Sequence, residues 1–373
     1  MKKVLKTILV LIILFITLGY LGNNLGILEF SDLLPISEEK MKSYTGFYYE
    51  QLDDNEKQIY IKLDEAIREK EQIVPLGRQE ENNLSNMLEK VMISYMGDNP
   101  ECFYLSNEYT VVVRDILVAK LATLNIQYIQ DINIEEAKVK LNETAEKFIN
   151  EVISEGMTDF EKELAIHNKL VEQVDYYEYE NIEDIPDLKH SAYGALVDKS
   201  AVCDGYSKAF KILLDKIGIE SIIIRGETND VAHAWNLVKL EDDYYHVDVT
   251  SDVFNNKNKK YTIHIYFNIT DKQISKTHNI SGDFNWPEAN SNKYEYYNAN
   301  GMILNDEDSI YSKMSKIVKK AKKSNILEFK IDAKYNKQMV LDTLYDMDFN
   351  NWKTNRLTSV TYSKIDDVYI FIK

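Results

Sequence analysis

The apolar positions of the chain change their spacing along its length, and these changes mark out its elements. In residues 203–217 the apolar side chains recur at intervals of three and four, the spacing of a helix with one buried face, and Gly218 ends the run. Two later runs, 233–240 and 244–250, are rich in aromatic and branched residues and are separated by the acidic turn 241–243. The pattern predicts a helix followed by a β-hairpin.

Cys203 falls in the first turn of the predicted helix, where unpaired backbone N–H groups favour a thiolate. We expect Ser200 to cap this helix and Gly205 to let its first turn approach another backbone. The effect of a helix end is about 0.3–1 kcal/mol at exposed sites and up to about 2 kcal/mol when partly buried, too little to ionise a thiol fully at neutral pH. A reactive thiol here therefore needs an imidazole partner.

The predicted hairpin offers such a partner. Side chains alternate faces along a strand, so His233 and Asp248 share a face only if the loop has an even number of residues. A loop of residues 241–242 would place Trp235 opposite Asp248 and make His233 its diagonal neighbour. We then expect Asp248 to accept a hydrogen bond from one ring nitrogen of His233, while the other ring nitrogen faces Cys203.

In this order the residues resemble the transglutaminase-like superfamily of papain-related Cys-His-Asp enzymes, in its bacterial, membrane-anchored type. The shared elements stand here as VCDGY, a Gly-Ile turn, HAWN and HVDVT, with Val249 where many members have proline. The resemblance covers about residues 158–255. It implies that Cys203 is the nucleophile, His233 the base and Asp248 the orienting residue. It also implies an α+β fold whose Cys-bearing helix packs on an antiparallel sheet bearing His and Asp.

The implied chemistry is attack of a thiolate on an amide carbonyl, either a glutamine side chain or a peptide bond, to form a thioester. Water would resolve the thioester by hydrolysis or deamidation, and a primary amine would resolve it by cross-linking. The oxyanion needs the backbone N–H of Cys203 and one further donor that the sequence does not identify. Animal members bind calcium, but no run of this chain matches such a site, so we expect no cofactor and no metal.

Other interpretations of these residues remain open. A lone cysteine beside a helix is most often a small buried hydrophobe. His246 shares a face with Asp248 and is an alternative partner, and a metal site of His233, His246 and Asp248 is conceivable although no further ligand has a recognised spacing. Ser207 half-matches a serine nucleophile elbow, but it lies beyond the first turn of a helix.

The chain begins with a charged end followed by an apolar run. Lys2, Lys3 and Lys6 precede a nearly uninterrupted apolar stretch over residues 7–21, which approaches the roughly 20 residues that span a bilayer. No small-x-small cleavage site stands clearly after it. We expect residues 1–25 to be an uncleaved transmembrane signal anchor, with a removed signal peptide or a buried core helix as alternatives. The anchor predicts a cell-membrane protein with one span and an extracytoplasmic catalytic domain.

The composition and the net charge of the chain limit the kinds of molecule that it is expected to bind. The chain has 373 residues, of which 45% are hydrophobic and 28% charged, as in folded proteins. Its net charge of −17 argues against nucleic acids, whose phosphates would repel it. Its two cysteines, Cys102 and Cys203, permit a disulfide in principle. A catalytic Cys203 must be free, which leaves Cys102 as a buried thiol.

The remaining pattern predicts αβ modules on both sides of the catalytic core. A capping box at Thr158 and Glu161 opens a helix that carries His167, which we expect to be structural or exposed. Residues 255–295 are interpreted as rich in loops. We expect four parts, namely the transmembrane anchor at 1–25, an N-terminal αβ region at 26–155, the transglutaminase-like catalytic domain at 156–295 and a small C-terminal αβ module at 296–373. Helices are expected near 53–70, 80–96, 134–155, 159–174, 306–323 and 334–346, and strands near 100–113, 116–129, 326–332, 357–363 and 367–372.

The leading hypothesis is a membrane-anchored thiol enzyme, a cysteine acyltransferase or a cysteine peptidase, that acts on amides of protein or cell-wall peptide in the cell envelope. The tyrosine-rich segment 175–187 precedes Cys203 and is interpreted as a loop that borders the cleft, in which Tyr176 and Tyr177 either hold a peptide or glycan substrate or are simply exposed. A catalytically silent binding or envelope-assembly module that retains the fold is the alternative. The two predict different reactivity, because only an enzyme requires Cys203 to be alkylated faster than Cys102 near neutral pH.

Overall fold

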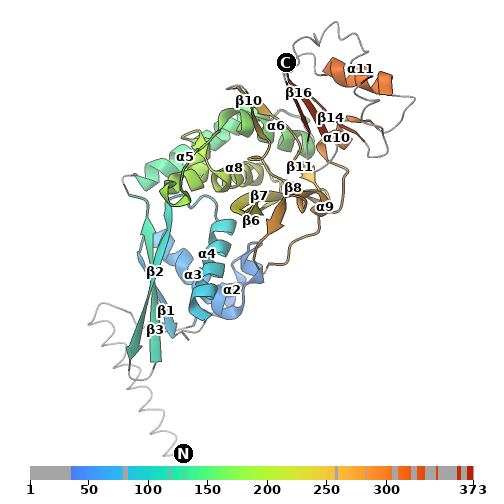
Figure 1. Ribbon diagram of the computed structural model, residues 1–373. Coiled ribbons are helices and arrows are strands. Elements are labelled where there is room, and N and C mark those ends of the chain that lie inside the picture. Colours follow the sequence, from blue (N-terminus) through green and yellow to red (C-terminus); the bar gives the residue numbers. More distant parts are fainter. Residues whose placement is uncertain are drawn as a thin grey trace, which may run out of the picture. The chain divides into compact units, whose positions relative to one another are not determined.

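The computed structural model describes residues 35–78, 83–116, 119–130, 132–256, 259–282, 284–304, 310–320, 326–331, 342, 359–362 and 368–372. The chain forms two compact units, one ending at Ile132 and the other beginning at Asn133 (Figure 1). The predicted anchor at residues 1–25 lies outside the described residues. None of the helices that the structure describes has the length and apolar character needed to cross a membrane.

The first unit combines helices with a small antiparallel sheet in the strand order β1-β3-β2. Its elements are α2 (Glu38–Lys42), η2 (Tyr49–Gln51), α3 (Asp54–Glu69), β1 (Ile73–Arg78), α4 (Leu84–Asp98), β2 (Leu105–Ile116) and β3 (Ala119–Tyr128). The predicted helices and the two strand regions are confirmed. The sequence pattern missed β1, because Pro75 and Gly77 interrupt it, and the ladder shifts register between them at this sheet edge.

The second unit begins with a layer of helices, α5 (Ile134–Val152), α6 (Asp159–Gln173), α7 (Ala192–Leu196) and α8 (Cys203–Lys216). Helix α6 opens with the predicted capping box between Thr158 and Glu161. Helix α5 packs against α6, α7 and α8 and so belongs to this unit. The domain boundaries at 155 and 295 stay predictions.

Helix α8 packs on a five-stranded antiparallel sheet, as the resemblance implied (Figure 1). The strand order is β11 (Phe267–Ile269), β8 (Asp243–Val247), β7 (Val231–Leu240), β6 (Ser221–Thr228) and β12 (His278–Ile280). The helix ends as predicted, since its C-cap Ile217 is followed by Gly218 at φ +80°. The domain is therefore a mixed fold of helix and sheet.

The register of the hairpin also follows the prediction. Leu240 pairs with Asp243, so residues 241–242 form a two-residue loop, in which Glu241 has φ 55°. Asn236 pairs with Val247, which brings the preceding residue, Trp235, opposite Asp248. The even loop places His233 and Asp248 on one face of the sheet.

Short elements connect the sheet to the rest of the second unit. They are β4 (Asp175–Tyr176), η4 (Ile182–Asp184), η5 (Asp187–His190), β5 (Ser200–Ala201), β9 (Val253–Asn256), β10 (Lys259–Thr262), α9 (Asp271–Ile274) and α10 (Tyr296–Ala299). The segment interpreted as rich in loops, 255–295, thus contributes two strands to the five-stranded sheet, β11 and β12.

The C-terminal part is a separate sheet with its own buried cluster. Strands β13 (Ile303–Leu304), β14 (Ile326–Ile331), β16 (Val368–Ile372) and β15 (Ser359–Tyr362) lie in that order, and the apolar face of α11 (Ile310–Lys320) joins their core. The predicted strands are confirmed, whereas the predicted helix at 334–346 lies outside the described residues apart from residue 342.

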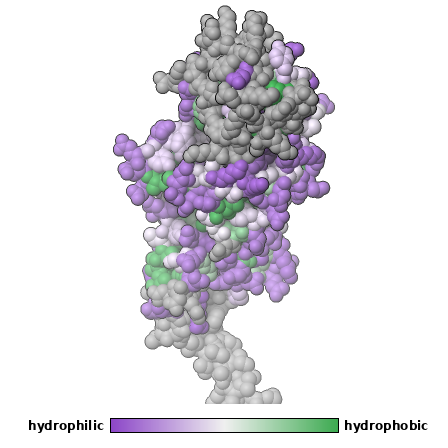
Figure 2. Space-filling model, turned by 45° about the vertical axis from the view of Figure 1, so that its right-hand side comes forward, coloured by the Kyte–Doolittle hydropathy of each residue, from purple (hydrophilic) through white to green (hydrophobic). Residues whose placement is uncertain are grey.

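Figure 2 shows a face on which most described side chains are hydrophilic and apolar ones form only small areas.

Candidate active site

Cys203 is the first residue of α8, and it is free and partly exposed. No side chain caps this helix, because its N-cap is Val202. The prediction that Ser200 would cap it is wrong, since Ser200 lies in β5 and pairs with Asp175 of β4. The first N–H groups of α8 are therefore not used by a capping side chain.

Gly205 allows the first turn of α8 to approach another backbone, as expected. A Cβ at this position would lie 2.7 Å from the carbonyl oxygen of Lys189 and 2.8 Å from that of Ser191. Both distances are shorter than any side chain tolerates, so glycine is required here.

A buried ionic group fixes the same turn to the sheet. Asp204 pairs with Lys208 at 2.7 Å and with Arg225 of β6 at 3.0 Å. Burial alone would raise the pKa of Asp204, but the charges of Arg225 and Lys208 outweigh it and lower the pKa to about 2. The residue after Cys203 is thus a charged anchor between α8 and β6.

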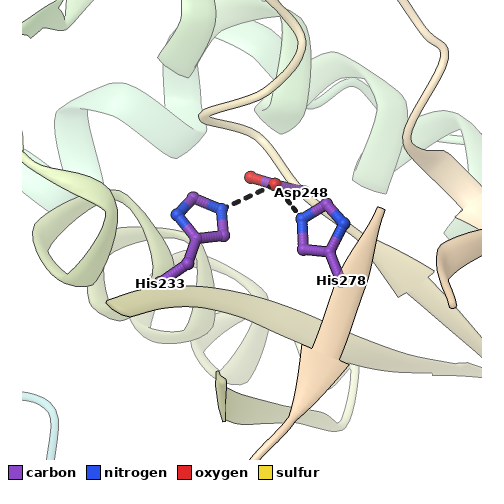
Figure 3. Close-up of side chains that lie close together, drawn as sticks. All are labelled: His233, Asp248 and His278. Carbon is purple, nitrogen blue, oxygen red and sulfur yellow. Dashed lines mark hydrogen bonds and ion pairs between the residues drawn. The ribbon is translucent and has the colours of Figure 1, made fainter. Parts of the chain in front are cut away.

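His233 and Asp248 meet as the register prediction requires. Nε2 of His233 lies 2.8 Å from Oδ2 of Asp248 (Figure 3). Cys203 lies close enough to His233 to interact with its ring, and Nδ1 is the ring nitrogen that does not face Asp248. The structure therefore brings the three predicted residues together in the predicted order.

The surroundings of His233 favour its charged form. Burial alone would lower the pKa of this imidazole, but the Asp248 carboxylate and the hydrogen bonds to Asp248 and Cys203 outweigh it and raise the pKa to about 10. These contacts favour the imidazolium form of His233, the state that stabilises a neighbouring thiolate and can protonate a leaving amine.

Asp248 is fully buried and accepts hydrogen bonds from four donors. Its Oδ1 accepts from the backbone N–H groups of Thr250 and Ser251, at 3.0 and 3.1 Å. Its Oδ2 accepts from the ring nitrogens of His233 and His278. Burial works against ionisation, but these partners outweigh it and hold the pKa of Asp248 well below its usual range.

His278 is the residue of this group that sequence analysis missed. Its Nε2 lies 3.0 Å from Oδ2 of Asp248, and Figure 3 shows the carboxylate between the two imidazoles. The residue lies in a three-residue strand in a segment without a strong periodic pattern, and it is 30 positions away from Asp248. No local signal in the sequence marks it.

Two alternatives from the sequence do not fit the geometry. Nδ1 of His246 accepts a hydrogen bond from Trp235 at 3.0 Å, and its Nε2 lies 2.8 Å from Asp271, so this ring serves neither Asp248 nor a metal set with it. Ser207 is buried and donates to the backbone oxygen of Cys203 at 2.9 Å, as a residue inside a helix does.

One set of side chains in the described part of the chain has the geometry of a metal-binding group. Ligand atoms of His233, Asp248 and His278 lie within 4.8 Å of one another. Zinc would have to replace the protons on both Nε2 atoms, and a structural zinc site has four protein ligands. Because both nitrogens lie at hydrogen-bond distance from one carboxylate oxygen, we interpret the group as hydrogen-bonded side chains.

The tyrosine-rich segment runs beside the strand that precedes Cys203. Strand β4 pairs in parallel with β5, which places Tyr176 next to Ala201, and the N–H of Tyr177 donates to the carbonyl of Ala201 at 2.9 Å. Burial, followed by the charge of Cys203, raises the pKa of Tyr176 above its ordinary value. Tyr176 is thus close enough to Cys203 for the two side chains to interact electrostatically.

Residues 146–249 match the family model of the transglutaminase-like superfamily, and the match includes the three predicted site residues. A structure described as a TGase is 14% identical, with a TM-score of 0.30, over 49% of this chain and 51% of that one. A candidate cysteine protease from Cytophaga hutchinsonii is 12% identical, with a TM-score of 0.24, over 39% of this chain and 65% of that one.

A candidate protease from Parabacteroides distasonis is 10% identical, with a TM-score of 0.21, over 44% of this chain and 43% of that one. The chain thus spans between about two fifths and two thirds of the length of these proteins. No curated protein sequence matches it.

Proposed function

Because residues 146–249 contain a transglutaminase-like domain, we propose that this protein is a thiol enzyme that acts on amide bonds through Cys203. The observation that carries the proposal is the hydrogen bond of 2.8 Å between His233 and Asp248, with a free and partly exposed Cys203 at the other side of the imidazole. A buried histidine–carboxylate pair without such a thiol would not support it.

The first step is acylation. The Cys203 thiolate attacks the carbonyl carbon of an amide, and the carbonyl oxygen becomes an oxyanion. The imidazolium of His233 then gives its proton to the departing nitrogen, the C–N bond breaks and a thioester remains on Cys203. Asp248 keeps the ring oriented throughout, because two backbone N–H groups hold its Oδ1.

The oxyanion requires donors aimed at the place where its charge develops. The backbone N–H of Cys203 is one, since no side chain caps α8. Tyr176 of β4 pairs with Ala201, two residues before Cys203. Removal of a single donor of this kind typically raises the barrier by about 2.7–4 kcal/mol.

The second step resolves the thioester. His233, now neutral, takes a proton from water or from a primary amine, which attacks the thioester carbon and releases Cys203. Water gives hydrolysis or deamidation, and an amine gives cross-linking. The substrate class is an amide of protein or cell-wall peptide.

The N-terminal segment bears on where the protein acts. Residues 1–25 anchor the chain in the cell membrane, and the catalytic domain acts outside the cytoplasm. The support is the apolar run that follows Lys2, Lys3 and Lys6. Digestion of intact cells with an external protease should remove residues 146–249 from the membrane fraction, and full protection of this region would contradict it.

The decisive experiment traps the acyl-enzyme on a glutamine-containing peptide. Wild type should form the adduct, and addition of a primary amine should increase turnover only if the enzyme cross-links. Cys203→Ala should form no adduct, whereas Cys102→Ala is the matched control and should form it normally, because Cys102 is buried among tyrosines of the first unit. An adduct on Cys203→Ala would refute the assignment of the nucleophile.

A catalytically silent binding module remains the second candidate. The partial exposure of Cys203 separates the two, because an enzyme needs that thiol to react. Equal alkylation rates at Cys203 and Cys102 near pH 7 would favour the binding module.

A further inference from the structure

His278 comes from an edge strand that contributes nothing else to the proposed reaction. Strand β12 pairs with β6 so that His278 lies opposite Thr228, and Thr228 lies opposite Val231 of β7. Residues opposite one another in antiparallel strands point to the same face. His278 and His233 therefore project from the same face of the sheet.

One indole lies against both imidazoles. The ring of Trp235 is 4.9 Å from that of His278 and 6.1 Å from that of His233, and the two imidazole rings are 5.3 Å apart. A Cβ on Gly226 would lie 2.8 Å from this indole and 2.1 Å from the carbonyl oxygen of Asn279. Glycine at this point of β6 thus lets β12 come close enough for His278 to reach Asp248.

The position of one proton on His278 follows from the contact of its Nε2 with Asp248. A carboxylate only accepts hydrogen bonds, so Nε2 of His278 must carry a proton to donate to Asp248. Its Nδ1 lies 2.8 Å from the hydroxyl of Thr277, which also lies 3.4 Å from the carbonyl oxygen of Ile274. Thr277 thus holds the His278 ring in the orientation in which Nε2 donates to Asp248.

We propose that His278 is a positioning residue that shares Oδ2 of Asp248 with His233. It thereby limits how strongly Asp248 stabilises the proton on His233, which His233 must give to the leaving amine. An oxygen that accepts two hydrogen bonds stabilises each donor less than it would stabilise one alone. A general acid works best when its pKa is near the working pH. This inference rests on the function proposed above.

Other titratable groups surround this arrangement. Cys203 faces His233, and His246 lies on the other side of Trp235. The ring of Tyr266 is 5.4 Å from His278, and Asp252 lies close to Tyr266. Burial, followed by the charges of Asp248 and Asp252, raises the pKa of Tyr266 to about 12, so it stays neutral over the range tested.

The test measures the rate of alkylation of Cys203 by iodoacetamide from pH 6 to about pH 11 in the full chain. Loss of the His233 proton changes the reactivity of the thiolate and gives an upper step in the profile. His278→Phe keeps a ring but removes the donor, and His278→Gln keeps an N–H that can reach Asp248. His246→Gln is the matched control, because His246 is equally buried on the same face and does not contact Asp248.

We expect His278→Phe to move the upper step to higher pH by roughly 0.5–1 unit, because Asp248 then holds His233 alone. The step of His278→Gln and of His246→Gln should stay at its wild-type position. A purely structural role would lower the melting temperature and leave the step in place. The proposal is overturned by an unmoved step in His278→Phe, by an equal shift in His278→Gln, or by an equal shift in His246→Gln.

Thr277→Val keeps the proposal testable if His278→Phe does not fold. It removes the partner of Nδ1, loosens the orientation in which Nε2 donates to Asp248 and should shift the step upward by less than about half a unit, whereas no shift refutes the proposal. The proposed function fails in a different way. Cys203 in wild type would then react no faster than Cys102, and this inference would fall with it.

Discussion

The second unit contains two buried networks built from the same chemical groups, and only one has the parts of an active site. The catalytic network comprises Cys203, His233, Asp248 and His278. The bracing network comprises His167, Asn168, Asp252, His264 and Glu328. In it His167 lies 3.1 Å from Asp252, and His264 lies 2.6 Å from Glu328. Histidine–carboxylate pairs at these distances are therefore not by themselves evidence of catalysis.

The difference lies in what the second ring nitrogen faces. In the bracing network both rings face Oδ1 of Asn168, at 3.1 and 2.8 Å, and His264 also stacks on Tyr296 with centroids 3.7 Å apart. A cavity of about 510 Å³ is lined by Asn168, His264 and Glu328, and no residue of the catalytic network lines it. In the catalytic network the corresponding nitrogen of His233 faces a partly exposed thiol. A nucleophile within reach of solvent distinguishes a reactive pair from a structural one.

The bracing network joins elements that are far apart in the sequence. Glu328 belongs to β14 of the C-terminal sheet and accepts from the backbone N–H of His264 and from the hydroxyl of Tyr297, at 3.2 and 3.0 Å. His167 belongs to α6. The two networks meet in one short segment, where the N–H of Asp252 donates to the carbonyl of Asp248 at 3.3 Å.

Exchange of one histidine in each network should give the largest contrast. His233→Gln should lower activity on a glutamine-containing peptide by about 10³-fold or more, because the acid and base of both steps are lost. It should also slow alkylation of Cys203 at pH 7 by about 10- to 50-fold, as the thiolate loses its imidazolium. His264→Gln should leave the alkylation rate within about twofold. Equal losses in both variants would erase the distinction between the networks.

Truncation of Glu328 should give the largest effect on stability. Glu328→Ala removes the partner of His264 and Tyr297 and should lower the free energy of unfolding by about 3 kcal/mol, measured by urea denaturation. Glu328→Gln is the matched control and should cost less, because its amide oxygen still accepts. Loss of Cys203 reactivity in a folded Glu328→Ala protein would contradict a purely bracing role.

A buried carboxyl without a histidine partner sharpens the comparison. Glu163 is fully buried, with Asn268 donating to its Oε2 at 2.9 Å, and burial raises its pKa to about 8. The native state thus holds this proton more tightly than the unfolded state, so stability falls as pH rises from about 4.5 to 8. Glu163→Gln should remove that loss and be more stable than wild type by roughly 2–3 kcal/mol at pH 9. Parallel stability curves for the two proteins between pH 5 and 9 would disprove it.

The charged form of His233 predicts a second, smaller dependence of stability on pH. Its pKa is raised from 6.5 to about 10, so its stabilising contribution is complete below pH 6.5 and is lost as pH rises to about 10. Asp248 has a lowered pKa and begins to lose its contribution only in acid. Between pH 7 and 9 the stability of wild type relative to His233→Gln should fall by at most about 1.4 kcal/mol per pH unit. A constant difference would mean that His233 is neutral in the native state.

Local spacing predicted much of this molecule. The interval of apolar residues in 203–217 predicted α8, and its end at Gly218 is confirmed. The alternation in 233–250, combined with an even loop, predicted the hydrogen bond between His233 and Asp248, because a strand has a strict period of two. Motif order then sufficed to place Cys203 near this pair, although one strand, β6, lies between the helix and the hairpin in the chain.

Contacts between distant segments were decided only by the tertiary structure. His278 is an isolated histidine in an irregular segment, and it reaches Asp248 because Gly226 lets an edge strand approach Trp235. Serine is a residue type that often caps helices, but Ser200 pairs with Asp175 and therefore lies in a strand. His246 lies on the same sheet face as Asp248, and only packing assigned it to Trp235 and Asp271 instead. Periodicity reports which face a side chain takes, whereas the choice among partners on that face depends on which segments the fold brings into contact.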